Sequence, residues 1–327
     1  MWIAFSVIAA FLFLAAMVLY FAGDGVQPSV VGADALGRDL FKKIRKIEIV
    51  TSRKASEQLA GQYHSVFKGR GMSFDEVRLY QPGDEIRFID WNVSARAGDV
   101  YVKRFVEERE LTVMLIVDVS GSLQFGSQAQ YKREMAAELS ALLAFSAIKN
   151  NDRVGLIMFT DQIERFVPPK KGRKHVMRLI TEIMNFTPEG RGTDIGGALE
   201  YLSRITQRKS VAFLISDFQV PTESFIRSLR IVSRRHDLVP VVIRDPMEFE
   251  LPDLGLTLLE DLETGRPTWV DTSSKAVRQS YAERNQVAHE RLLQLFRKHK
   301  LDAVDVGTGS GYVQAIVQFF QLRARRY

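Results

Sequence analysis

The stretch Leu111-Thr-Val-Met-Leu-Ile-Val-Asp-Val-Ser-Gly-Ser122 decides the fold of this 327-residue chain. Its apolar run has the length and composition of a buried strand. Asp118 would end the strand, and Ser120 and Ser122 follow at alternate positions, so all three side chains would reach one small space. Hard divalent cations prefer such oxygen ligands. A serine nucleophile fits less well, because no histidine lies nearby in the sequence.

Alternating strand and helix patterns continue from this stretch to the end of the chain. Further strands are predicted at 153–159, 163–167, 211–216, 238–243 and 301–306, a hairpin at 256–270, and helices at 131–149, 175–185, 195–205, 223–233, 274–299 and 312–322. This order predicts an α/β fold over residues 111–322, with a doubly wound, mostly parallel sheet and helices on both faces. Such sheets bind ligands beyond the carboxyl ends of their strands.

Two later segments should meet the first stretch at that edge. Thr193 lies in a glycine-rich loop before a predicted helix, and Asp217 ends another apolar strand. The hydroxyl oxygens suit a small octahedral cation, and the two aspartates supply charge directly or through water. We therefore predict a metal site, with Mg²⁺ as the default ion and Mn²⁺ as the alternative, made of Asp118, Ser120, Ser122, Thr193 and Asp217.

The composition excludes several kinds of chemistry. The chain has no cysteine, so disulfides, thiolate metal sites and cysteine nucleophiles are absent. Its formal net charge of +6 is modest, and the basic residues are too diffuse to indicate nucleic-acid binding. The charge is instead compatible with weak attraction to anionic lipid or to an acidic protein partner.

Residues 1–23 are uncharged and almost entirely apolar. About 20 such residues span a bilayer core as a helix, so we predict a single transmembrane anchor. A cleaved signal peptide is the alternative, but it normally has a basic start and a shorter apolar stretch. Basic residues follow between Arg38 and Lys46. By the positive-inside rule they place the rest of the chain in the cytoplasm, at the inner membrane.

Two segments separate this anchor from the main domain. Residues 24–60 are predicted to form a basic juxtamembrane linker, whose second half is either an amphipathic helix on the membrane or a solvated helix. Residues 61–110 hold glycines and a Pro-Gly turn signal, and they predict a small β-rich module. We expect Trp91 to be a core residue of this module. Its short strands are predicted at 77–80, 86–91 and 100–106.

The motifs also resemble known families. Asp-x-Ser-x-Ser after the first strand, the later Gly-Thr-Asp and the strand-terminal Asp217 resemble the metal-ion-dependent adhesion site of von Willebrand factor A domains. The strings from Tyr63 to Arg96 and from Val102 to Leu111 resemble the hallmark of the bacterial domain-of-unknown-function 58 family. The resemblance implies a metal whose coordination is completed by a carboxylate of a protein partner. It also suggests a MoxR-type AAA+ ATPase as the partner, in complex assembly or chaperone-like remodelling.

Other readings of the same residues stay open. An aspartate with two serines is also typical of a helix start. A metal-assisted hydrolase would use the same site, although no Gly-x-Ser-x-Gly motif is present and the five histidines lie in unrelated contexts, at His64, His175, His236, His289 and His299. A scaffold with an unused site is the third alternative. We expect a non-enzymatic, metal-dependent protein–protein interaction module.

Overall fold

The central sheet of the protein is built around the apolar stretch that begins at Leu111. The computed structural model describes residues 15–17, 57–67, 73–106, 110–127, 131–262, 265–309 and 311–326. The six strands lie in the order β11-β8-β7-β4-β5-β6, and only the edge strand β6 runs antiparallel to its neighbour. Their bounds are β4 Thr112–Asp118, β5 Arg153–Phe159, β6 Ile163–Lys170, β7 Val211–Ser216, β8 Asp237–Arg244 and β11 Val304–Gly307. The predicted α/β fold with a mostly parallel sheet is confirmed.

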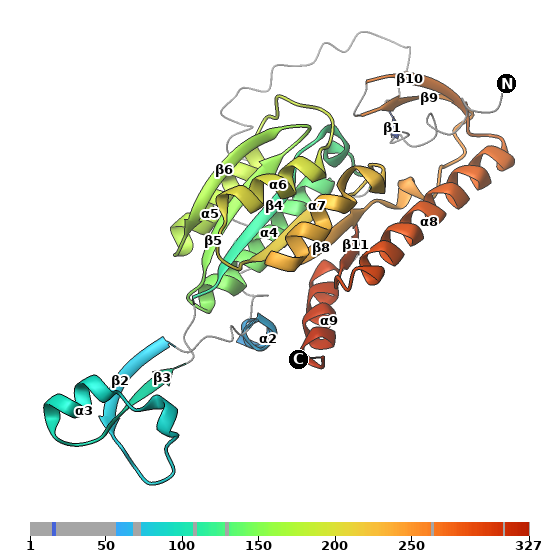
Figure 1. The fold of residues 1–327 in the computed structure, drawn as a ribbon. Helices are drawn as coiled ribbons and strands as arrows, with labels where there is room; N and C mark the ends of the chain where they lie inside the picture. The colour runs from blue at the N-terminus through green and yellow to red at the C-terminus, as the bar shows by residue number, and fades with distance from the viewer. Residues whose placement is uncertain are drawn as a thin grey trace, which may run out of the picture.

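Helices cover both faces of this sheet (Figure 1). Alternate residues of β4 reach opposite faces, because side chains of a strand alternate. Val113, Leu115 and Val117 lie in one apolar cluster, and Met114 and Ile116 lie in the other. The first cluster contains α4 Lys132–Lys149, α5 Arg173–Asn185 and α9 Tyr312–Ala324, and the second contains α6 Ile195–Ile205, α7 Thr222–Arg235 and α8 Lys275–Lys298. Burial on both faces explains why β4 has no polar residue between Val113 and Val117.

The helix α2 (Glu57–Phe67) belongs to the core of the main domain. Tyr63 is fully buried, and its hydroxyl donates a hydrogen bond of 3.0 Å to Asp152. Phe67 packs edge-on against the rings of Phe213 and Phe320. The structure therefore places residues 61–67 with the main domain, whereas the sequence pattern assigned them to the small module.

The small module contains fewer strands than the sequence predicts. Its strands β2 (Ser73–Leu79) and β3 (Tyr101–Val106) pair antiparallel and lie apart from the main domain (Figure 1). The expected strand at 86–91 is wrong. A short 3₁₀ helix, η1 (Ile86–Phe88), and the helix α3 (Trp91–Ala97) stand there instead. The carboxylate of Asp90 accepts hydrogen bonds from two amides of the first turn of α3, and this N-cap starts the helix.

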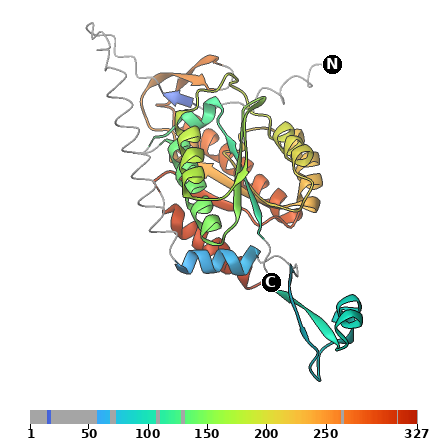
Figure 2. The same ribbon diagram turned by 90° about the vertical axis from the view of Figure 1, so that its left-hand side faces the viewer.

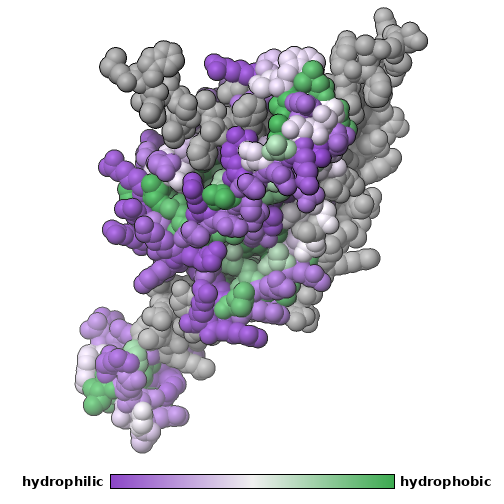
Figure 3. Space-filling model, turned by 90° about the vertical axis from the view of Figure 1, so that its right-hand side faces the viewer, coloured by the Kyte–Doolittle hydropathy of each residue, from purple (hydrophilic) through white to green (hydrophobic). Residues whose placement is uncertain are grey.

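Trp91 is not a core residue, since it is 66% exposed. Ile86 and Leu79 of the same module are exposed as well, and Figure 3 shows apolar residues on its surface. Among the residues described for the module, Val102 is the buried apolar one. The expectation failed because a hairpin of this size, standing away from the main domain, has no second layer to cover a tryptophan.

Most of the predicted anchor and linker lies outside the described residues. Ala15–Met17 forms a short strand, β1, that pairs antiparallel with β9 (Leu256–Asp261), so these three residues differ from the expected helix. The open edge of β9 presents backbone groups that an apolar tripeptide can pair. Of the linker at 24–60, the structure describes only the start of α2. None of the helices in the described ranges is long and apolar enough to cross a bilayer. The transmembrane span stays a prediction.

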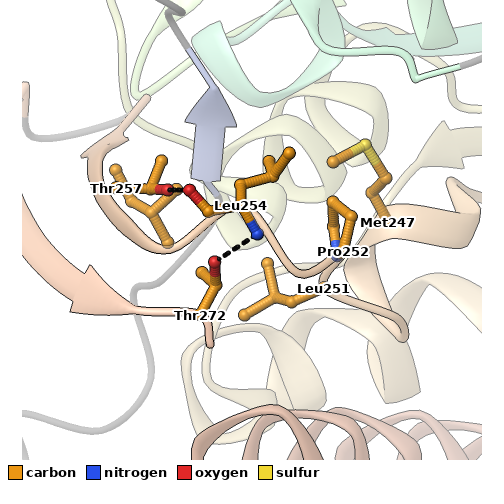
Figure 4. Close-up of a pocket in the computed structure, with 7 residues that line it drawn as sticks. Met247, Leu251, Pro252, Leu254, Thr257 and Thr272 are labelled. Atoms are coloured by element: carbon orange, nitrogen blue, oxygen red, sulfur yellow. Dashed lines mark hydrogen bonds between the residues drawn. The ribbon is translucent and has the colours of Figure 1, made fainter. Parts of the chain in front are cut away.

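The predicted hairpin at 256–270 is present as β9 and β10 (Pro267–Asp271). Its base is held by a hydrogen bond of 2.9 Å from the Leu254 amide to the Thr272 hydroxyl (Figure 4). The cavity enclosed there, between Met247 and Thr257, has a volume of about 10 Å³. That volume holds a single water at most, so this pocket is not a ligand site. The hydrogen bond to Thr272 fixes the hairpin to the domain at its base.

Candidate metal site

The carboxyl end of β4 brings three of the predicted ligands together. Asp118 is the last residue of the strand, and Ser120 and Ser122 begin the short 3₁₀ helix η2 (Gly121–Gln124). All three side chains are 0% exposed. The hydroxyl oxygens of Ser120 and Ser122 lie 3.1 Å apart. The turn after the strand therefore faces both hydroxyls to the same buried point.

The carboxylate of Asp118 is held from both sides. One oxygen accepts a hydrogen bond of 2.9 Å from the Ser120 amide, and the other accepts one of 2.6 Å from the Ser216 hydroxyl. Ser216 ends β7, and its own oxygen accepts from the Phe218 amide at 3.0 Å. Phe218 has a φ of 56°, a conformation that bulky residues rarely adopt and that often marks functional sites. The sequence analysis did not predict Ser216 as part of the site. Its position next to Asp217, at the end of the same strand, was the signal that could have indicated it.

Asp217 is nearly buried and faces a lysine that the sequence analysis did not single out. The Lys132 ammonium, at the start of α4, donates a hydrogen bond of 2.7 Å to one oxygen of Asp217. The same ammonium forms an ion pair with Glu248, which lies in the segment after β8. Lys132 is 0% exposed. The three residues form a buried triad beside Asp118.

The electrostatics of the cluster follow from burial and from crowding of like charges. Burial, and then the charge of Asp217, raise the pKa of Asp118 to about 7. Burial also raises the pKa of Glu248 above its usual value, although Lys132 opposes this. Burial lowers the pKa of Lys132, but the carboxylates of Asp217 and Glu248 outweigh it and leave the pKa above its usual value. The lysine stays charged, and its positive charge offsets only one of three carboxylates.

Thr193 lies in a loop that is tied to the same edge of the sheet. Its side chain is partly buried. The Gly121 amide donates to the Arg191 carbonyl at 3.1 Å, and the Asp194 amide donates to the Thr160 carbonyl at 2.8 Å. Gly190 is required there, because an added Cβ would stand 2.3 Å from the Thr160 hydroxyl oxygen. The loop with Thr193 therefore packs against the turn that holds the two serines.

The hairpin β9–β10 lies beyond the same end of the sheet as the turn after β4 (Figure 2). A Cβ added at Gly121 would stand 2.4 Å from the Leu262 carbonyl oxygen, so the backbone at the end of β9 lies directly on the turn after β4. Arg191 approaches the same hairpin near Gly265. The three ligand side chains are 0% exposed, so a carboxylate from outside could reach them only if the segments packed around this turn moved.

The donor set fits a hard divalent cation. Two hydroxyls and one carboxylate converge at the end of β4, and all are oxygen ligands. In the ranges that the structure describes, no three His, Cys, Asp or Glu side chains form a metal cluster, so any metal here needs the serine hydroxyls. Asp118, Ser120 and Ser122 are the residues to hold the ion. Asp217 already binds Lys132 through one oxygen, so it contributes charge from a greater distance.

The chain belongs to the DUF58 family of proteins. The family model "Protein of unknown function DUF58" matches residues 76–291, which include the small module and the site edge of the sheet. The uncharacterized protein Rv1480 of Mycobacterium tuberculosis (strain H37Rv) is 33% identical over 240 residues, which is 73% of this chain and 75% of that protein.

More distant similarities cover parts of the chain. The magnesium-chelatase 67 kDa subunit of Heliobacterium mobile is 29% identical over 111 residues, which is 34% of this chain and 15% of that subunit. Among solved structures, BatB of Bacteroides thetaiotaomicron is similar, with a TM-score of 0.43 and 16% identity over 66% of this chain and 99% of that one. This structural likeness is too distant to carry a functional argument.

Proposed function

We propose that this protein is a membrane-anchored interaction module that binds a carboxylate of a protein partner through Mg²⁺ or Mn²⁺ held at the candidate metal site. The main support for this proposal is the buried cluster at the end of β4, where the hydroxyls of Ser120 and Ser122 face each other beside Asp118. Three buried carboxyl groups lie beside one ammonium, so their full ionisation would leave an excess of negative charge. A divalent cation would relieve that excess.

Binding of a partner requires the hairpin β9–β10 to move. The ligand side chains are fully buried, and the Leu262 carbonyl at the end of the hairpin lies against Gly121, between the two serines. An incoming carboxylate can reach the ion only when this contact opens. The hairpin is held at its base by Thr272, so its far end is the part that can move with least loss of contacts. Partner binding would thus be coupled to hairpin displacement.

We propose binding rather than catalysis as the activity. A serine nucleophile needs a base, and the histidines with defined partners have them elsewhere. His175 bonds the Val154 carbonyl, His236 bonds Ser210, and His289 bonds Asp305. Lys132 is held between two carboxylates with a raised pKa, which makes it a poor proton acceptor.

A MoxR-type AAA+ ATPase is the proposed partner, on the family resemblance alone. Part of this chain is similar to a protein named as a magnesium-chelatase subunit, and this similarity supports the proposal of a magnesium ion at the candidate site. The anchor at residues 1–23 is likewise a proposal, supported by composition.

The test is metal binding by the full chain in a mild detergent. Mg²⁺ should raise the melting temperature of the wild type, because a ligand of the folded state stabilises it, by about 2.7 kcal/mol at a hundredfold excess over Kd. Asp118→Asn and Ser120→Ala should abolish this response. Ser146→Ala, a buried serine on α4 away from the site, is the matched control.

Partner binding is tested by capture of a purified MoxR-type ATPase on the immobilised chain. Capture should require Mg²⁺, should be lost in EDTA, and should be lost in Asp118→Asn. Capture that is unchanged by EDTA and by Asp118→Asn would refute the metal-bridged contact. A wild type without any Mg²⁺ or Mn²⁺ response would refute the metal site itself.

A further inference from the structure

A second polar site lies at the opposite edge of the sheet. The amino ends of β4, β5, β7 and β8 line a groove of about 1100 Å³, which we call the basic groove. The loops before β7 and β8, the turn after α8 and the end of α2 complete its walls. None of the predicted metal ligands lines it, so it is separate from the candidate metal site.

The acidic residues of the basic groove are already neutralised. Asp237 pairs with Arg323 at 2.5 Å, Asp302 pairs with Arg326 at 2.5 Å, and Glu110 pairs with Arg153 at 3.0 Å. Each of these carboxylates therefore has a cation of its own. They do not offset the remaining basic residues of the groove.

The cations that remain are exposed and take part in no ion pair with other described residues. They come from two loops and from the last turn of α7, and they are Arg208, Lys209, Arg234 and Lys300. The helix dipole accounts for a basic residue at the end of α7 or α8. It does not account for Arg208 and Lys209, which follow the end of α6 by several residues. An excess of positive charge at one concave surface attracts anionic ligands.

A buried histidine in the same wall has one ring nitrogen without a hydrogen-bond partner among the described residues. The His236 Nδ1 lies 2.9 Å from the Ser210 hydroxyl, and both residues line the basic groove. Its Nε2 is buried and has no hydrogen-bond partner among the described residues, and the residue is 3% exposed. An unsatisfied buried polar atom is unfavourable, so the wall of the basic groove contains a polar group that the described fold leaves without a hydrogen bond.

We propose that the basic groove binds an extended acidic segment of a protein partner. The apolar residues Leu111, Val66 and Leu301 line the groove together with these basic residues. This lining suits a peptide whose carboxylates meet the basic residues while an apolar side chain meets the apolar ones. The volume far exceeds that of a phosphate ion, and a concave surface excludes the flat face of a membrane. Charge complementarity favours an anion, and the size, concavity and apolar lining residues of the groove favour an acidic peptide over phosphate and a membrane.

The experiment measures fluorescence anisotropy of a labelled 14-residue Asp/Glu-rich peptide with a central Leu-Ile pair, mixed with the full chain in detergent. Binding should be saturable and should weaken steeply with salt, because exposed charges are screened. The triple variant Arg208→Glu, Lys209→Glu, Arg234→Glu should bind at least about 30-fold more weakly. The matched control reverses three exposed cations on α8, in Lys275→Glu, Arg284→Glu, Arg291→Glu, and should change the affinity less than about twofold.

Two further arms identify the ligand and its place. A photo-reactive residue in place of the central Leu should cross-link within 110–112, 233–238 or 300–302. Inorganic phosphate and dihexanoyl phosphatidylglycerol should not displace the peptide at matched ionic strength. Equal loss of binding in both triple variants, cross-links elsewhere, or displacement by phosphate or lipid would overturn the proposal. Because metal binding is not measured here, failure of the proposed metal site would leave this result intact.

Discussion

The two ends of the strands in the central sheet differ in the surroundings of their charged residues. At the carboxyl edge, Asp118 and Asp217 are buried, and Asp217 shares one lysine with Glu248. At the amino edge, the acids are paired and the free cations face solvent. At the carboxyl edge, burial makes an unpaired charge energetically costly, so each charged group needs a particular partner. At the amino edge, solvent screens the exposed cations, and each adds a small share to the attraction of an anion. One fold thus separates the candidate metal site from the basic groove, and we expect the two to act independently.

The largest effect expected at the carboxyl edge is loss of Lys132. Lys132→Met leaves two buried carboxylates without their cation, so the free energy of unfolding should fall by about 3–5 kcal/mol. Urea denaturation measures this. Neutralising the partners as well, in Lys132→Met with Asp217→Asn and Glu248→Gln, should recover much of the loss. A single variant within about 1 kcal/mol of wild type would show that the triad does not form.

The next effect is the pH dependence caused by Asp118. Its folded pKa of about 7 exceeds the ordinary value, so the folded state holds a proton that the unfolded state has released. Stability without metal is therefore fully present at low pH and declines as pH rises towards 7, by up to about 4 kcal/mol. Asp118→Asn should remove this decline in melts at pH 4 to 8. An identical profile in both proteins would contradict the raised pKa.

A smaller effect is expected from Gly121→Ala. The added methyl would meet the Leu262 carbonyl, so the hairpin must shift from the site at a cost of about 1–3 kcal/mol. Hydrogen exchange should quicken in residues 256–271 and not in β4. As a control, Gly61→Ala has open space around the new methyl and should leave the hairpin unchanged. Unaltered exchange in Gly121→Ala would show that the hairpin does not rest on the turn.

The smallest expected effect is on communication between the two edges. The charge reversal of the basic groove should leave the Mg²⁺ response unchanged, and Asp118→Asn should leave peptide affinity unchanged, each within about twofold. Distant sites without shared contacts act additively. Thermal shift and anisotropy with each variant check this. A large effect of one edge on the other would replace the picture of two separate sites with a coupled one.

The sequence predicted the strand from Leu111 and its terminal Asp118, because an apolar run and its polar end are adjacent in the chain. It did not single out Lys132, since a lysine at a helix start looks like a solvated residue and is rarely buried without partners. Those partners are remote, with Asp217 85 positions along the chain. Trp91 was misplaced for the converse reason: large aromatic residues are usually covered, and only the layout of the module leaves this one exposed.

The sequence by itself determined the alternation of strands and helices, the family of the chain and which oxygen-bearing residues end the strands, because periodicity and local motifs are properties of neighbouring residues. The tertiary structure decided what surrounds those residues. It placed Lys132 on Asp217, laid the hairpin over Gly121 and gathered Arg208, Arg234 and Lys300 around one groove. Burial and charge pairing arise between segments far apart in the chain, so only the fold could set them.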